Sequence, residues 1–195
     1  MSSVVISGDT SGTVTLAAPA VAGSNTITLQ AATATMSVNT LATAVASTSG
    51  TSIDFTSLPS WIKRITVMFS GVSVSGTSQI QVQLGTSGGV VATGYLGSVD
   101  SSATTVGAST FTTGLALERA AGATAAGLRN GLVTFANLTS NTWAGSALIG
   151  YSSSGLMSYS ATSVPLGGTL DRVRITTVNG TDTFDAGTIN ILYEG

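Results

Sequence analysis

Two residue types are missing from this chain of 195 residues, which contains no cysteine and no histidine. Disulfide bonds, thiol nucleophiles and zinc sites built from cysteine or histidine are therefore excluded. A Ser-His-Asp triad is excluded as well, because its general base is a histidine. Acid–base chemistry would have to rely on carboxylates, which can work in pairs without histidine.

Charge is also scarce, since charged residues make up 7% of the chain, against about 25% in an average soluble domain. Six basic and eight acidic residues give a net charge of −2 at pH 7. No broad basic surface exists for nucleic acid or for an anionic membrane. A surface with so few charges does little to keep molecules apart. We therefore expect an oligomer, or a chain docked on a larger assembly.

Long apolar runs are absent, because no window reaches the roughly 18 continuous apolar residues of a membrane-spanning helix. Residues 1–10 also lack the basic region that opens a secretory signal peptide. We expect no membrane insertion and no signal peptide, with synthesis in the cytoplasm.

The uncharged stretch 11–36 contains two short alternations of polar and apolar residues, at 13–16 and 26–29. A period of two predicts half-buried strands, and two short strands cannot bury an apolar face alone. We expect a slender shaft or docking segment whose contacts include Val14, Leu16, Ile27 and Leu29. The alternative is a flexible leader rich in serine, alanine and glycine.

Residues 37–51 have the composition of a linker, although a short helix is also compatible with the spacing of Leu41 and Val45. We place a domain boundary near Gly50. The chain then divides into an N-terminal docking or oligomerisation segment, residues 1–50, and a head domain, residues 51–195.

The remainder of the chain shows repeated β-strand patterns separated by glycine-rich turns. We expect strands at 61–74, 80–84, 95–99, 132–135, 147–151, 156–164, 172–178 and 188–193. About eight strands without βαβ alternation predict a mainly β protein with an antiparallel sandwich, and a jelly-roll-like head fits this count best. Residues 114–129 allow a short helix or a loop.

The carboxylates show no local signature of a catalytic pair, so we expect no enzyme activity. Asp182 and Asp185 lie in a turn between strands, where aspartate commonly caps backbone N–H groups. A calcium site formed by these two acids is the alternative. Lys63 is the single lysine and no phosphate-binding loop surrounds it, so no cofactor is expected.

The large aromatic residues are candidates for contact with a host or partner molecule. Trp143, Tyr151 and Tyr159 are the candidates, because aromatic rings stack on sugars and fill interfaces. Trp143 follows a polar loop and is the better candidate for an exposed contact, although core packing is the favoured role for it. Trp61 follows Pro59 at the start of a strand and is expected in the core.

Residues 6–36, ISGDTSGTVTLAAPAVAGSNTITLQAATATM, resemble the N-terminal segment of tail fibre and related structural proteins of tailed bacteriophages. The resemblance is strongest to phages of aquatic bacteria, including cyanophages. The stretches SIDFTSLPSWIKRITVMFSGVSVSGTSQIQVQLG (52–85) and LDRVRITTVNGTDTFDAGTINILYEG (170–195) are similar to the β-rich body of the same group. The matched stretches contain no catalytic motif.

The resemblance implies a virion protein without enzyme activity. It favours a trimeric tail fibre protein that docks on the tail by its N-terminal segment. Loops within 94–164 would then contact the host surface, with glycan as the expected partner. A capsid decoration or cement protein is the alternative, and a glycan-degrading spike is a third reading.

Overall fold

The computed structural model describes residues 3–7, 12–17, 37–102, 107–152 and 155–195. The chain divides into two compact units, Met1–Met36 and Ser37–Gly195. Each unit is described by itself.

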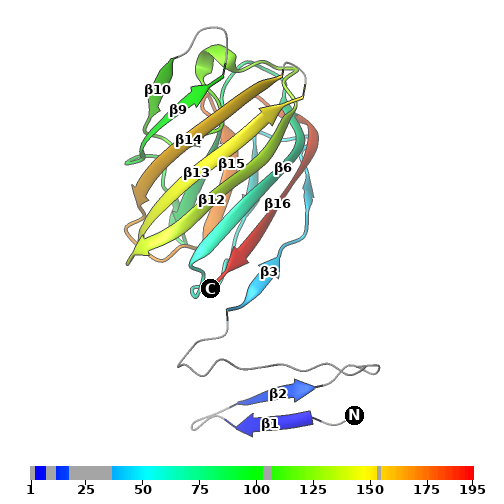
Figure 1. Ribbon diagram of the computed structural model, residues 1–195, viewed down its shortest axis with the longest axis vertical. Coiled ribbons are helices and arrows are strands. Elements are labelled where there is room, and N and C mark those ends of the chain that lie inside the picture. The colour runs from blue at the N-terminus through cyan, green and yellow to red at the C-terminus, as the bar shows by residue number, and fades with distance from the viewer. Residues whose placement is uncertain (1–2, 8–11, 18–36, 103–106, 153–154) are drawn as a thin grey trace. The chain divides into compact units, whose positions relative to one another are not determined.

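The first unit contains an antiparallel hairpin of β1 (Ser3–Ser7) and β2 (Thr13–Ala17) (Figure 1). Strand β2 confirms the strand expected over 13–16, and it includes the backbone of Val14 and Leu16. The strand expected over 26–29, with Ile27 and Leu29, lies outside the described residues.

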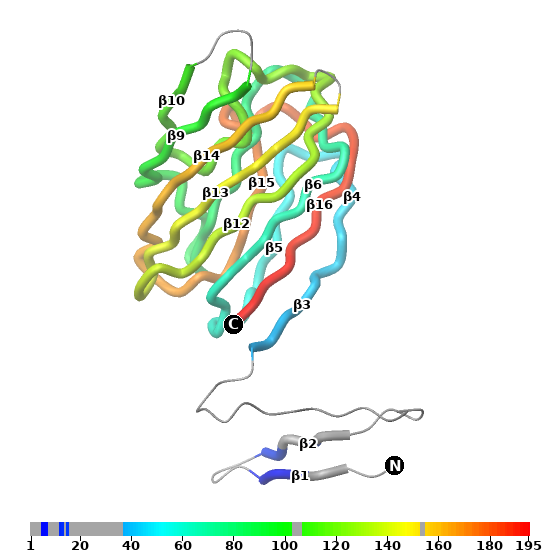
Figure 2. Tube along the Cα trace, viewed as in Figure 1, coloured from blue at the N-terminus to red at the C-terminus, as the bar shows by residue number. Residues whose placement is uncertain are grey.

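The second unit contains two antiparallel sheets, and these establish the β-sandwich class expected from the sequence (Figures 1 and 2). The large sheet follows the order β10 (Ala108–Phe111), β9 (Leu96–Ser101), β14 (Leu156–Pro165), β13 (Thr142–Tyr151), β12 (Arg129–Thr139), β6 (Arg64–Val74), β16 (Phe184–Glu194) and β3 (Asn39–Leu41), with β4 (Val45–Ala46) also on β16. The small sheet follows the order β11 (Leu115–Ala116), β7 (Ile80–Thr86), β15 (Arg172–Thr177) and β5 (Ser52–Phe55), with β8 (Gly89–Val90) on β7. The jelly-roll connectivity stays a prediction.

Alternation along the strands places one apolar face of each sheet in a shared core. On β6, Ile65, Val67 and Phe69 are buried, whereas Thr66 and Met68 between them are partly exposed. This is the expected consequence of side chains that point to opposite faces of a strand. The core therefore lies between the two sheets, and the outer face of each sheet is free to carry function.

Two expectations for the connecting segments are corrected. The segment expected to be a linker, 37–51, contributes β3 and β4, because its backbone pairs with β16. The division between the units accordingly falls after Met36 and not near Gly50. For the segment 114–129, where the sequence allowed a short helix or a loop, the structure has the short strand β11 and a 3-10 turn at Ala120–Gly122, which agrees with the second alternative.

Trp61 is exposed over 39% of its surface, which corrects its expected place in the core. Its ring lies 5.8 Å from that of Tyr193, measured between centroids. The residue precedes β6, so the strand pattern that buries Ile65 does not extend to it.

Candidate interaction surfaces

The outer face of β12, β13 and β14, which we call the central face, is uncharged. The outward residues are recognised by their partial or full exposure between buried neighbours. They include Leu132, Thr134, Ala136, Ala144, Ser146, Leu148, Met157, Tyr159, Ala161 and Ser163. In these three strands, whose backbone the structure describes throughout, no outward side chain carries a charge. Exposed and uncharged surfaces of this kind favour contact with another protein.

A row of large apolar side chains crosses the central face. Strand register places Leu132 opposite Leu148, and Leu148 opposite Tyr159. These side chains are exposed over 51%, 58% and 53% of their surfaces. Residues directly opposite each other on neighbouring strands have Cβ atoms about 5 Å apart, so the three side chains form one continuous strip.

Tyr159 ends this strip beside a carboxylate on β9. Its hydroxyl donates a hydrogen bond to Asp100 Oδ2, over 3.2 Å. This bond and the negative charge of Asp100 raise the pKa of Tyr159 above its usual value. Tyr159 and Asp100 also line a shallow depression of about 310 Å³. The arrangement combines an exposed aromatic ring with a hydrogen-bond acceptor, as expected for the contact residue proposed from the sequence.

Trp143 and Tyr151, the other two aromatic candidates, are buried, which corrects the contact role proposed for them. Trp143 is exposed over 2% of its surface and Tyr151 over 3%, because both lie on the inward face of β13. For Trp143, the favoured role of core packing holds. Strong burial raises the pKa of the Tyr151 hydroxyl, with a further contribution from the charge of Glu118.

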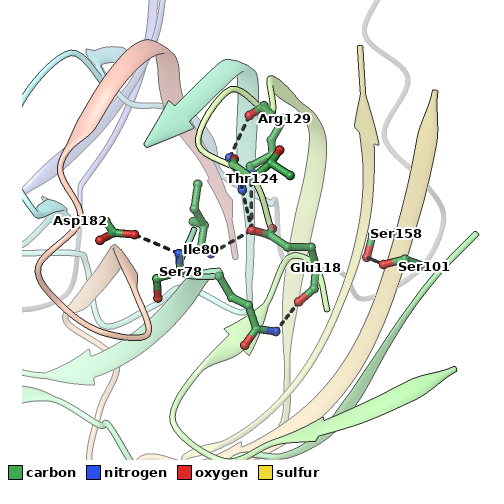
Figure 3. A network of polar contacts seen from close by, with 10 residues as sticks. Ser78, Ile80, Ser101, Glu118, Thr124, Arg129, Ser158 and Asp182 are labelled. Carbon is green, nitrogen blue, oxygen red and sulfur yellow. Dashed lines mark hydrogen bonds and ion pairs between the residues drawn. The ribbon is translucent and has the colours of Figure 1, made fainter. Parts of the chain in front are cut away.

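The buried polar cluster around Glu118 was not identified from the sequence (Figure 3). Glu118 and Arg129 form an ion pair of 2.8 Å in which neither side chain has any exposed surface. The guanidinium carbon of Arg129 lies 5.5 Å from the centre of the Tyr151 ring. The residue pattern gave no signal of this pairing, although Glu118 and Arg129 are only 11 residues apart, because the segment 114–129 allowed either a helix or a loop.

Asp182 and Asp185, the candidate calcium ligands, bond to different protein groups. Asp182 accepts hydrogen bonds from the backbone N–H of Ser78, over 2.9 Å, and from Asn179 Nδ2, over 2.7 Å (Figure 3 shows the first). Asp185 accepts a hydrogen bond from the Ser73 hydroxyl. Among the described residues, no group of three or more acidic, histidine or cysteine side chains is placed to hold a metal ion. The hydrogen bonds of Asp182 agree with the turn-capping role expected for it.

The proposed docking contacts on the first unit have no described side chains. Val14 and Leu16 are placed by their backbone in β2, whereas Ile27 and Leu29 lie outside the described residues. On β1, Val5 and Ile6 are exposed over 55% and 57% of their surfaces. This hairpin thus presents apolar side chains, as a docking segment would.

No family model matches this chain, and neither a curated protein nor a solved structure matches it significantly. Among the described residues, no helix is long and apolar enough to cross a membrane.

Proposed function

We propose that this chain is a structural protein of a bacteriophage particle, without enzyme activity, that works as a homo-oligomer. A trimeric tail fibre protein is the form we favour. The observation that carries the proposal is the uncharged central face with its strip of Leu132, Leu148 and Tyr159. We assign this face to contact between copies of the chain.

The strip favours association because its side chains remain about half exposed in the single chain. Fully burying an aliphatic or aromatic side chain of this size is worth roughly 1.5–3 kcal/mol, so covering the exposed half of each contributes about 1 kcal/mol. Alanine, serine and threonine around the strip allow a flat partner to approach closely. The absence of outward charge on these strands means that covering Leu132 and Leu148 desolvates no ion of β12, β13 or β14. The carboxylate of Asp100 on β9, in contrast, lies at the end of the strip beside Tyr159.

In this proposal, the first unit docks the oligomer on the tail through its apolar strand residues. The head meets the host surface, and loops within 94–164 would make that contact with glycan. Several copies in one particle would raise the overall affinity of individually weak contacts.

The first test is the mass of the full chain in solution, measured by light scattering after size-exclusion chromatography. We expect a trimer, and we expect Leu148→Lys to give a monomer because it places a charge in the middle of the strip. The control is Val178→Lys, since Val178 is 48% exposed and follows β15 of the small sheet, away from the central face. A monomeric parent protein, or a Leu148→Lys variant that remains oligomeric, would overturn the assignment of this face.

The second test is immunogold electron microscopy on intact particles, with antibody raised against the full chain. Gold at the tail is the expected result. Gold distributed over the capsid would favour a capsid decoration protein over a tail fibre protein. The same uncharged face would then contact capsid subunits. Particles that carry no gold would overturn the virion assignment.

A further inference from the structure

The outer face of the small sheet differs from the central face, because it is polar and hollowed. Alternation along β5, β7 and β15 turns polar side chains outward in two adjacent rows. Strand register aligns them as Ser52–Thr176–Gln81 and Asp54–Arg174–Gln83. A pocket of about 320 Å³ lies over these rows. Its size is at the lower end of the range typical of small-molecule sites.

The floor of the pocket includes two glutamines that are almost completely buried. Gln81 is exposed over 4% of its surface and Gln83 over 5%. The Thr113 hydroxyl donates to Gln81 Oε1, and Gln83 Nε2 donates to the Thr113 carbonyl, both over 2.8 Å. A carbonyl oxygen only accepts hydrogen bonds, so the orientation of the Gln83 amide is fixed by this contact.

These contacts leave one half of each amide unused. Within the part of the chain that the structure describes, neither Gln81 Nε2 nor Gln83 Oε1 has a hydrogen-bond partner. The pocket therefore contains a donor and an acceptor on adjacent side chains of one strand face, already held in place. Neither atom is among the fully buried side-chain atoms that lack a partner, so both are accessible from the pocket and a polar ligand could bond to them there.

The one charged side chain among the described lining residues is already paired within the protein. Among the described lining residues, Arg174 alone is charged. Its guanidinium donates to both carboxylate oxygens of Asp54, over 2.7 and 3.1 Å. The hydrogen bond to Asp54 raises the pKa of Arg174, and the contact with the Asp54 side chain balances the charge of the guanidinium. This arrangement disfavours an anion and favours a neutral polar molecule.

We propose that this pocket binds a neutral, hydroxyl-rich ligand of the size of one or two sugar rings. A hydroxyl group donates and accepts at once, which matches the free donor of Gln81 and the free acceptor of Gln83. Val90 and Val178 line the pocket and offer apolar contacts for the C–H groups of such a ring. The site is separate from the central face and does not depend on the proposed oligomer.

The test is an NMR titration of the full chain with maltose, lactose and N-acetylglucosamine as neutral probes, and with glucuronate as the charged probe. The side-chain amide signals of Gln81 and Gln83 report on the floor directly. We expect a saturable shift of these signals with at least one neutral probe. No saturable shift with any neutral probe, or tighter binding of glucuronate, would overturn the proposal.

Variants separate this site from general surface binding. Ala92→Phe places a bulky side chain at an exposed lining position and should abolish the shift, whereas Thr93→Phe changes the exposed neighbour outside the lining and should preserve it. Gln81→Met removes the free donor with little change of volume and should weaken binding about tenfold, as expected for one hydrogen bond. If Gln81→Met fails to fold, the comparison of ligand binding by Ala92→Phe and Thr93→Phe tests the site. Equal binding by these two variants would refute the site.

Discussion

Arg129 donates two hydrogen bonds to a single oxygen of Glu118, from Nε over 3.1 Å and from a terminal nitrogen over 2.8 Å. The same Glu118 oxygen accepts from the backbone N–H of Ile80, over 3.1 Å (Figure 3). Arg129 begins β12 of the large sheet, and Ile80 begins β7 of the small sheet. The carboxylate of Glu118 thus connects the two layers of the sandwich from a segment between them in the sequence.

Arg129→Met is expected to destabilise the protein by about 3–5 kcal/mol, because it leaves the carboxylate of Glu118 buried without its cation. The measurement is the free energy of unfolding from urea denaturation. The double variant Glu118→Leu/Arg129→Met should lose less than the single variant, since no buried charge remains unpaired. The single variant Glu118→Leu completes the comparison. If the stability lost by the double variant equals the sum of the losses of Glu118→Leu and Arg129→Met, the two side chains are not coupled.

Gly131→Ala is expected to cost about 2–4 kcal/mol of stability, because the backbone conformation and the space at this position both require glycine. Gly131 has φ +145°, and a Cβ atom there would lie 2.1 Å from the Leu148 carbonyl oxygen. The pairing of β12 with β6 is irregular at this point, between Arg129 and Gly131. Thermal and urea denaturation would measure the loss.

The control for this substitution is Gly155→Ala, where φ is +65° but nothing lies within 4 Å of the added atom. It isolates the cost of the left-handed conformation, which is about 1–2 kcal/mol. Equal losses in the two variants would mean that the strand relaxes away from the contact with Leu148.

The strands of the large sheet could be predicted because local alternation and tertiary burial agree there. Buried and outward residues alternate over residues 64–69 of β6 and throughout β13, so the period of two in the sequence is also the pattern of burial there. The expected sandwich class follows from this agreement. Tyr159 was correctly expected at the surface for the same reason, since it lies on the outward face of β14.

The remaining features depend on contacts that local alternation does not mark. β7 alternates in sequence, yet Gln81 and Gln83 are buried because the segment at Thr113 covers the outer face. Trp143 follows a polar loop, but its strand position turns it inward. The Glu118–Arg129 pair is only 11 residues apart, but this spacing is neither the period of two of a strand nor the three or four residues of a helical pair, so no local pattern marks it. The periodicity of a strand predicts which face each residue lies on. It does not predict whether another segment, such as the one at Thr113, covers that face.

Asp182→Asn is expected to make the stability of the protein less sensitive to acid. Hydrogen bonds from Asn179 and from the Ser78 backbone lower the pKa of Asp182 in the folded chain. The stabilisation is therefore fully present above the ordinary aspartate pKa of about 3.9 and is lost as the pH falls through the lower native value. Urea midpoints measured from neutral pH down to about pH 2 should fall less steeply in the variant.

Asn179→Ala offers an independent check, because Asn179 is the larger cause of the lowered pKa of Asp182. The acid dependence should weaken in this variant as well. An unchanged profile in both variants would assign the acid sensitivity to other carboxylates.

Asp100→Asn is expected to lower the pKa of Tyr159 towards its ordinary value of about 10, because the hydrogen bond to the carboxylate and its charge are the causes of the raised pKa. A raised tyrosine pKa stabilises the fold below the ordinary value, and this stabilisation is lost as the pH rises through the native value. NMR of the tyrosine ring carbons resolves each side chain during the titration. Tyr95 and Tyr151, whose pKa values are raised mainly by burial, should remain protonated until the chain unfolds. If Tyr159 titrates at the same pH in the parent protein and in Asp100→Asn, Asp100 does not control the ionisation of Tyr159. The hydrogen bond from the Tyr159 hydroxyl to Asp100 would then be absent in solution.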